Sequence, residues 1–173
     1  MPVFDGDAWA LPQDRALQAG AARLRAAVSE LPLRYAPFFG RLAGLWGISE
    51  ETVRSELARA KDATGWSRTL LPGLRAFEIE TGRARERARL LRFEPGSRFP
   101  NHRHRGAERL LVLEGALADG RGAKTHAGDE CAMAPGSEHE LYILGDGPCV
   151  TAVAEQGIEF TGSLLRFANW LLR

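Results

Sequence analysis

Short apolar runs, each separated from the next by a cluster of Gly, Pro or Asp, fill the second half of the chain. The clearest are Arg89–Phe93, Arg109–Leu113, His139–Leu144 and Cys149–Val153. Each run has the length of a β-strand, and turn signals recur roughly every 8 to 15 residues, which is typical of a β-sandwich or barrel. The sequence therefore predicts one all-β domain over residues 75–160.

Residues 12–63 have a different character, because they are rich in Ala, Leu, Arg and Glu and carry apolar positions at helical spacing. We predict three helices here, over residues 12–30, 35–46 and 49–63. Gly47 can take the left-handed conformation that closes a helix, and the hydroxyl of Ser49 can cap the next one.

The predicted organisation has four parts. Residues 1–64 form an N-terminal helical segment, 65–74 a connector with a Pro-Gly turn, 75–160 the β domain, and 161–173 a short C-terminal helix that starts after a capping Ser163. Because apolar helix faces remain to be covered, we expect a homodimer.

Charge and hydropathy exclude several classes of partner. The chain has 23 Lys and Arg against 22 Asp and Glu, so it offers no general attraction to nucleic acid or to an anionic membrane. No apolar stretch reaches the roughly 18 to 20 residues of a membrane span, and the first residues lack a signal-peptide pattern. We expect a cytoplasmic protein whose two cysteines, Cys131 and Cys149, are structural rather than a redox pair.

All four histidines lie in the β half, and three of them can converge. His102 and His104 are two residues apart, so an extended strand projects both rings from one face, and Glu108 shares their even parity. A returning strand could bring His139 opposite them, giving three imidazoles and one carboxylate for a divalent transition metal. A His-x-His pair is also compatible with a solvated loop, and His126, beside Gly128, is expected at the surface.

The frame around these residues resembles the first motif of the cupin superfamily. Gly96 is followed by five residues, His102-x-His104, three residues, Glu108, six residues and Gly115. The resemblance implies a mainly β fold, a cupin (jelly-roll) β-barrel. It also implies a metal at the barrel mouth held by four ligands: His102, His104, Glu108 and His139.

The second cupin motif is matched less closely. Gly128, Gly136 and His139 fall at the family's spacing, but Pro135 directly precedes the glycine instead of standing two places before it. Ile143 replaces the usual Asn. The expected barrel lining, which could surround a small-molecule ligand, comprises Leu90, Leu110, Val112, Cys131 and Met133.

Most of the chain is similar to ChrR-type proteins. The similarity runs from the helical segment through Gly65-Trp-Ser and Leu70-Leu-Pro-Gly-Leu74 to the cupin opening Phe99-Pro-Asn-His102. In that family the cupin half is a metal-bearing sensor, and the helical half of fully equipped members is a zinc-dependent anti-sigma domain. This chain has no His or Cys before His102, so it lacks that second zinc site.

Two functions follow as hypotheses. The first is a regulatory or stress-sensing metal-binding cupin, linked to transcription and with a sigma factor as a partner, in which zinc is the favoured ion. The second is a small cupin enzyme, a dioxygenase or isomerase, in which six-coordinate Fe, Mn or Ni keeps two positions open for ligands. No further motif marks a catalytic acid or base, so the sequence leaves the catalytic residues unassigned.

Residues 42–59 also resemble a helix-turn-helix, with Gly47 at the turn and Val53 and Leu57 at buried positions. The would-be recognition helix carries Glu50, Glu51 and Glu56 beside its arginines, which gives little net attraction to phosphates. Two packed helices joined by a glycine turn explain the same pattern, and we prefer that interpretation.

Overall fold

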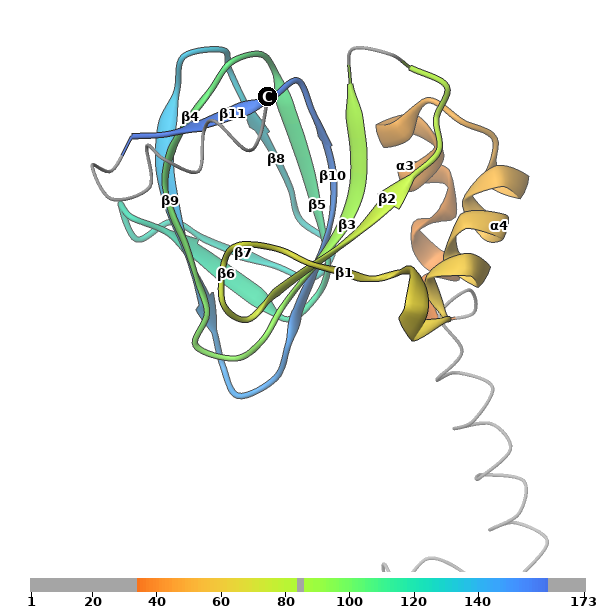
Figure 1. The fold of residues 1–173 in the computed structure, drawn as a ribbon, viewed down its shortest axis with the longest axis horizontal. Helices are drawn as coiled ribbons and strands as arrows, with labels where there is room; N and C mark the ends of the chain where they lie inside the picture. The colour runs from red at the N-terminus through yellow and green to blue at the C-terminus, as the bar shows by residue number, and fades with distance from the viewer. Residues whose placement is uncertain (1–33, 84–85, 162–173) are drawn as a thin grey trace, which may run out of the picture.

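A computed structural model describes residues 34–83 and 86–161 of the chain. The helices predicted over residues 12–30 and after Ser163 lie outside the described residues. The described part is a sandwich of two antiparallel sheets with a pair of helices on one outer face (Figure 1). None of its helices is long and apolar enough to cross a bilayer.

Eleven strands build the two sheets. The first sheet has the order β1-β2-β3-β10-β5-β8 and the second β11-β4-β9-β6-β7. The strands are β1 (Ser67–Arg68), β2 (Leu74–Ile79), β3 (Arg87–Phe93), β4 (Arg98–His104), β5 (Glu108–Glu114), β6 (Ala116–Asp119), β7 (Lys124–His126), β8 (Glu130–Met133), β9 (Glu138–Leu144), β10 (Cys149–Glu155) and β11 (Ile158–Phe160). The four runs predicted as strands are therefore β3, β5, β9 and β10.

The helical part is a short hairpin. A 3-10 turn, η1 (Ala36–Phe38), leads into α3 (Phe39–Trp46), which is followed by α4 (Glu50–Ala60) and a second 3-10 turn, η2 (Ala63–Gly65). Gly47 closes α3 with φ 65°, and its amide donates to the carbonyl of Ala43 at 2.8 Å. The Ser49 hydroxyl accepts from the Thr52 amide at 3.1 Å, which confirms the predicted cap.

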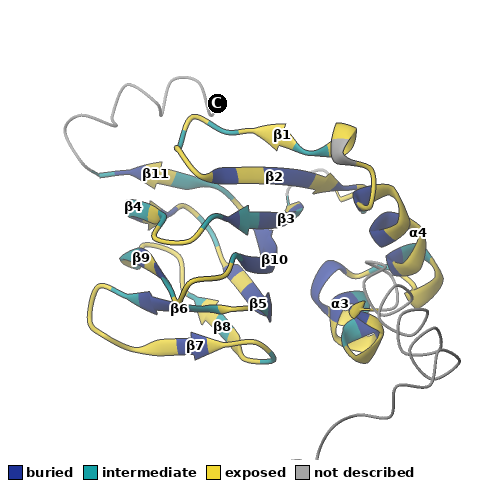
Figure 2. Ribbon diagram, turned by 90° about the horizontal axis from the view of Figure 1, so that it is seen from below, coloured by how far each residue is buried: buried dark blue, intermediate teal, exposed yellow. Residues whose placement is uncertain are grey.

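Two apolar cores lie on opposite faces of the first sheet (Figure 2). The inner core lies between the two sheets and includes Leu91, Phe93, Leu110, Val112, Leu117, Leu141, Ile143 and Cys149. The outer core lies between the helices and the first sheet and includes Leu42, Leu45, Trp46, Val53, Leu57, Phe77, Leu90, Leu111 and Ala152. The helices are thus held by one face of a sheet whose other face lines the barrel.

This arrangement corrects one predicted lining residue. Leu90 is fully buried, but it packs against the helices, because on β3 the alternate residues Leu91 and Phe93 face the barrel interior. Leu110 and Val112 do belong to the inner core as predicted. When both faces of a sheet are covered, the alternation of apolar residues does not show which face points into the barrel.

Trp46 connects the helices to the sheet. Its side chain has no exposed surface, and its indole Nε1 donates a hydrogen bond of 3.1 Å to the carbonyl of Val153 on β10. A second link comes from Arg109 on β5, which donates to the carbonyl of Gly44 at 3.0 Å. The C-terminal half of α3 is therefore tied to two adjacent strands of the sheet, β10 and β5.

Candidate metal centre

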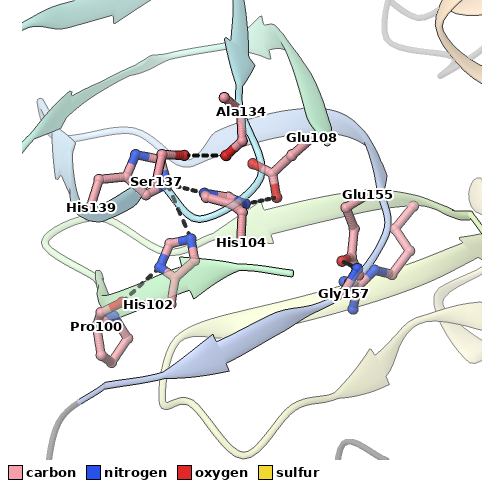
Figure 3. Close-up of polar contacts among 10 residues, drawn as sticks. Pro100, His102, His104, Glu108, Ala134, Ser137, His139, Glu155 and Gly157 are labelled. Atoms are coloured by element: carbon pink, nitrogen blue, oxygen red, sulfur yellow. Dashed lines mark hydrogen bonds and ion pairs between the residues drawn. The ribbon is translucent and has the colours of Figure 1, made fainter. Parts of the chain in front are cut away.

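Three histidine side chains from β4 and β9 converge between the sheets (Figure 3). His102 and His104 project from the same face of β4, as their spacing predicts, and His139 is the direct cross-strand partner of His102. The Nε2 atom of His139 lies 3.1 Å from Nε2 of His102 and 3.1 Å from Nε2 of His104. One ligand atom from each ring lies within 4.8 Å of the other two.

The protonation of these rings suits a cation. The Nδ1 atom of His102 is 2.9 Å from the carbonyl oxygen of Pro100. A carbonyl can only accept, so Nδ1 carries the proton and Nε2 keeps its lone pair. Burial lowers the pKa of His102 to about 3 and that of His104 to about 4, and it also lowers the pKa of His139. Neutral rings with facing nitrogens fit a transition-metal ion, which needs such lone pairs.

Glu108 lies beside this cluster rather than within it. Its carboxylate Oε2 is 3.6 Å from Nδ1 of His104, a buried nitrogen that has no hydrogen-bond partner within the described part of the chain. Histidines that bind a metal commonly donate their other N–H to a carboxylate. From this position Glu108 could either orient His104 or reach the ion itself, and its role as the fourth ligand remains a prediction.

A second buried carboxylate, Glu155 on β10, backs the site and was not predicted. It lies directly opposite Glu108 in the strand register, is 2% exposed, and forms an ion pair with Arg89. Burial raises the pKa of Glu108 to about 8; the charge of Glu155 adds to this effect and Arg89 opposes it. The only sequence signal was an acidic residue that ends an otherwise apolar strand.

A cavity of about 330 Å³ opens beside the cluster. Its apolar wall includes Leu74, Leu91, Phe99 and Phe160, and its polar wall includes Arg89, Arg105 and Glu155. The ring of Phe99 also contacts His102 edge-on, with 4.8 Å between ring centroids. Phe99 therefore touches both the cavity and the histidine cluster, and sequence reasoning missed it because an aromatic residue in a strand is ordinary core material.

The other residues singled out in the sequence lie apart from the cluster. His126 is exposed, with Nδ1 3.8 Å from Oδ2 of Asp129, which agrees with its predicted surface position. Cys131 and Cys149 are both free thiols. Burial raises the pKa of Cys149 to about 11, so this thiol is protonated at neutral pH.

The family model described as the ChrR cupin-like domain matches residues 55–159, more than half of the chain. Among solved structures, an RmlC-like cupin protein from Ralstonia eutropha JMP134 is 15% identical, covers 60% of this chain and 71% of its own, and has a TM-score of 0.52. Acetylacetone dioxygenase from Acinetobacter johnsonii is 12% identical, covers 60% and 76%, and has a TM-score of 0.52.

A structure of oxalate oxidase is 20% identical, covers 57% of this chain and 61% of its own, and has a TM-score of 0.48. The chain thus spans about three fifths of the length of that protein. The likenesses to the RmlC-like protein and to acetylacetone dioxygenase, at 15% and 12% identity, show a shared fold alone. No protein of curated function matches the chain.

Proposed function

The chain belongs to the ChrR cupin-like family, and from that premise we propose that it is a metal-binding regulatory protein. The convergence of three imidazole Nε2 atoms between the sheets carries the proposal. The proposed ligands are His102, His104, His139 and Glu108. Zinc is the first choice because it favours three nitrogens and one carboxylate in a closed tetrahedral site.

The proposed role of the ion is to couple the barrel to the helices. When bound, it would supply a positive charge that holds the three imidazoles together and favours the carboxylate form of Glu108. Glu155, opposite Glu108, is on the same strand as Val153, whose carbonyl accepts the hydrogen bond from Trp46. A change in the charge of Glu108 could therefore be transmitted through β10 to the C-terminal end of α3.

A sigma factor is the proposed partner, and the proposed assembly is a homodimer in the cytoplasm. Support comes from family membership and from the helices carried on the barrel. The missing N-terminal His and Cys ligands mean that any such contact uses the helices without a second zinc site. The acidic side chains at the start of α4 do not favour DNA.

The first experiment measures the metal directly. Protein purified without chelator or nickel resin is analysed for bound metals, alongside His104→Ala and the matched variant His126→Ala, which removes an exposed histidine. We expect about one zinc per chain in the wild type and in His126→Ala, and less than about a tenth of that in His104→Ala. Equal metal content in all three proteins would refute the proposed site.

The second experiment tests regulation. Hydrogen exchange of the amides in α3 and α4 is compared with and without bound zinc, again with His104→Ala as the metal-free reference. Regulation predicts a change in α3 protection on zinc binding, together with recovery of a sigma factor in pull-downs from host extract. Unchanged protection and no sigma factor would leave a metal site without a regulatory role.

The cavity beside Phe99 supports a second candidate, a small cupin enzyme that binds a small molecule in the barrel. Its wall carries both arginines and carboxylates, and Arg89 is already paired with Glu155, so the substrate would be a small polar molecule, with Fe, Mn or Ni as the ion. Oxygen uptake by iron-loaded protein on addition of carboxylate or diketone substrates would support a dioxygenase. Exclusive zinc content with no oxygen uptake would exclude it.

A further inference from the structure

A row of arginines crosses the outer face of the first sheet, where the helices pack. Arg68 on β1 is the direct partner of Arg75 on β2, and Arg75 is in turn the direct partner of Arg92 on β3. Side chains of directly opposed residues project from the same face, with Cβ atoms about 5 Å apart, and like charges in this arrangement are destabilising. Arg68 and Arg75 are exposed and Arg92 is partly exposed, so water screens much of this repulsion, and an anion bound between the side chains would relieve the rest.

Among the described residues, carboxylates supply only part of a balancing negative charge. The row continues from Arg92 through Val150 to Glu114, two strands further on. The Glu114 carboxylate is already engaged, because Arg34 Nε lies 2.9 Å from it and the Tyr35 hydroxyl donates to it. Glu94 Oε1 is 3.5 Å from Arg92 Nε. Within the described residues, neither Arg68 nor Arg75 forms an ion pair.

A cavity of about 430 Å³ lies over this row, between the sheet and the helical segment. The described residues that line it include cationic side chains and two carboxylates, and its apolar surface comes from an aromatic pair and aliphatic residues. The cationic liners are Arg34, Lys61, Arg75 and Arg92, the carboxylates Glu94 and Glu114, and the main apolar liners Tyr35, Trp66, Leu90 and Val150. The histidine cluster is on the other side of the sheet.

We propose that this cavity binds a small organic phosphate, whose dianionic group is held between Arg75 and Arg92 while its apolar part lies against Trp66. A guanidinium presents paired N–H donors that match phosphate oxygens. A tetrahedral dianion offers oxygens to both facing guanidiniums and neutralises both, whereas one carboxylate neutralises only one. The site is separate from the metal centre and does not depend on the function proposed for it.

The test uses the full chain and two probes, inorganic phosphate and phenyl phosphate, in calorimetric titrations at constant ionic strength. We expect saturable binding of both, with phenyl phosphate tighter because of Trp66. Arg75→Gln should weaken phenyl phosphate at least tenfold, and Arg75→Lys should weaken it less. Arg121→Gln, which removes an exposed arginine between β6 and β7, should bind as the wild type does. His104→Ala should also bind normally, because the metal centre is across the sheet.

Thermal unfolding gives an independent measure. Without phosphate, Arg75→Gln should melt at or above the wild-type temperature, because it removes a like-charge pair. Phenyl phosphate should raise the melting temperature of the wild type but not of Arg75→Gln. The proposal is overturned if sodium chloride at equal ionic strength stabilises the wild type equally, or if neither probe binds. It is also overturned if Arg121→Gln weakens binding as much as Arg75→Gln, or if Arg75→Gln alone lowers the melting temperature by several degrees.

Discussion

Glu108 and Glu155 lie directly opposite one another on β5 and β10, and both are buried between the two sheets. Arg89 is paired with Glu155, which leaves Glu108 without a cation of its own among the described residues. The raised pKa of Glu108, about 8, follows from this arrangement. In the absence of a metal, Glu108 is mostly protonated at neutral pH, whereas a bound cation would favour its carboxylate.

Glu108→Gln is expected to remove a pH dependence from the stability of the metal-free protein. The folded state holds the Glu108 proton up to a pKa of about 8, while the unfolded chain releases it near pH 4.5. The contribution of Glu108 to stability therefore falls as the pH rises between these values, on the order of 2 kcal/mol from pH 6 to pH 8. The buried histidines act in the opposite sense near pH 6.5, so the Glu108 contribution is read as the difference in slope between the wild type and Glu108→Gln. Urea unfolding at both pH values measures this slope. A Gln variant that keeps the wild-type slope would contradict the assignment.

Acid should destabilise the metal-free protein through its buried histidines. Their contribution to stability falls as the pH falls, whereas that of Glu108 falls as the pH rises. The folded pKa of His102 is about 3 and that of His104 about 4, below the unfolded value of about 6.5. Stability is then fully present above pH 6.5 and is lost as the pH falls toward 4, by about 1–2 kcal/mol per histidine at pH 5. Unfolding at pH 7 and pH 5 tests this. His102→Asn should lessen the loss, and His126→Asn should not.

Phe99 is expected to support metal binding without touching the ion. Its ring packs edge-on against His102, whose other side is fixed by the hydrogen bond to Pro100. Phe99→Ala should free this ring and weaken zinc about tenfold, and Phe99→Leu should weaken it less. Competition with a chromogenic chelator measures the affinity. The control is Tyr142→Ala, an exposed aromatic on β9, which should leave zinc affinity unchanged.

Two variants of Trp46 should separate the stability that its packing contributes from the stability that its hydrogen bond contributes. Trp46→Ala empties a fully buried site between the helices and the sheet and is expected to cost about 3–5 kcal/mol of unfolding free energy. Trp46→Phe keeps most of the volume but removes the hydrogen bond to the Val153 carbonyl, at a cost of about 0.5–1.5 kcal/mol. Denaturant unfolding of both variants gives the two values. Equal losses of unfolding free energy in the two variants would show that packing of an aromatic ring at this site contributes little.

The local signals in the sequence predicted both described α-helices and four of the eleven strands in the described residues. The turn glycine Gly47, the capping Ser49 and the β-runs act over a few residues, so their effect is readable without the tertiary fold. The spacing of His102 and His104 likewise fixed their common face, because a strand alternates its side chains. The meeting of these rings with His139 followed from a resemblance to cupins and could not be derived from spacing alone.

Other features needed contacts between distant strands. The sequence could not place Leu90 on the helix side of its sheet, because both faces of β3 are apolar. It could not predict that Glu108 lies opposite Glu155, because these residues are far apart in the chain and become neighbours only through the pairing of β5 with β10. The arginine row also depends on strand pairing, since Arg68, Arg75 and Arg92 follow no periodic pattern in the sequence.

The sequence by itself determined the two described α-helices, the four clearest strands and which histidines share a face, because those properties depend on neighbours along the chain. The tertiary structure decided which charges stand opposite one another and which face of the first sheet meets the helices. Strand register and sheet order set those relationships, and both result from the packing of the whole barrel.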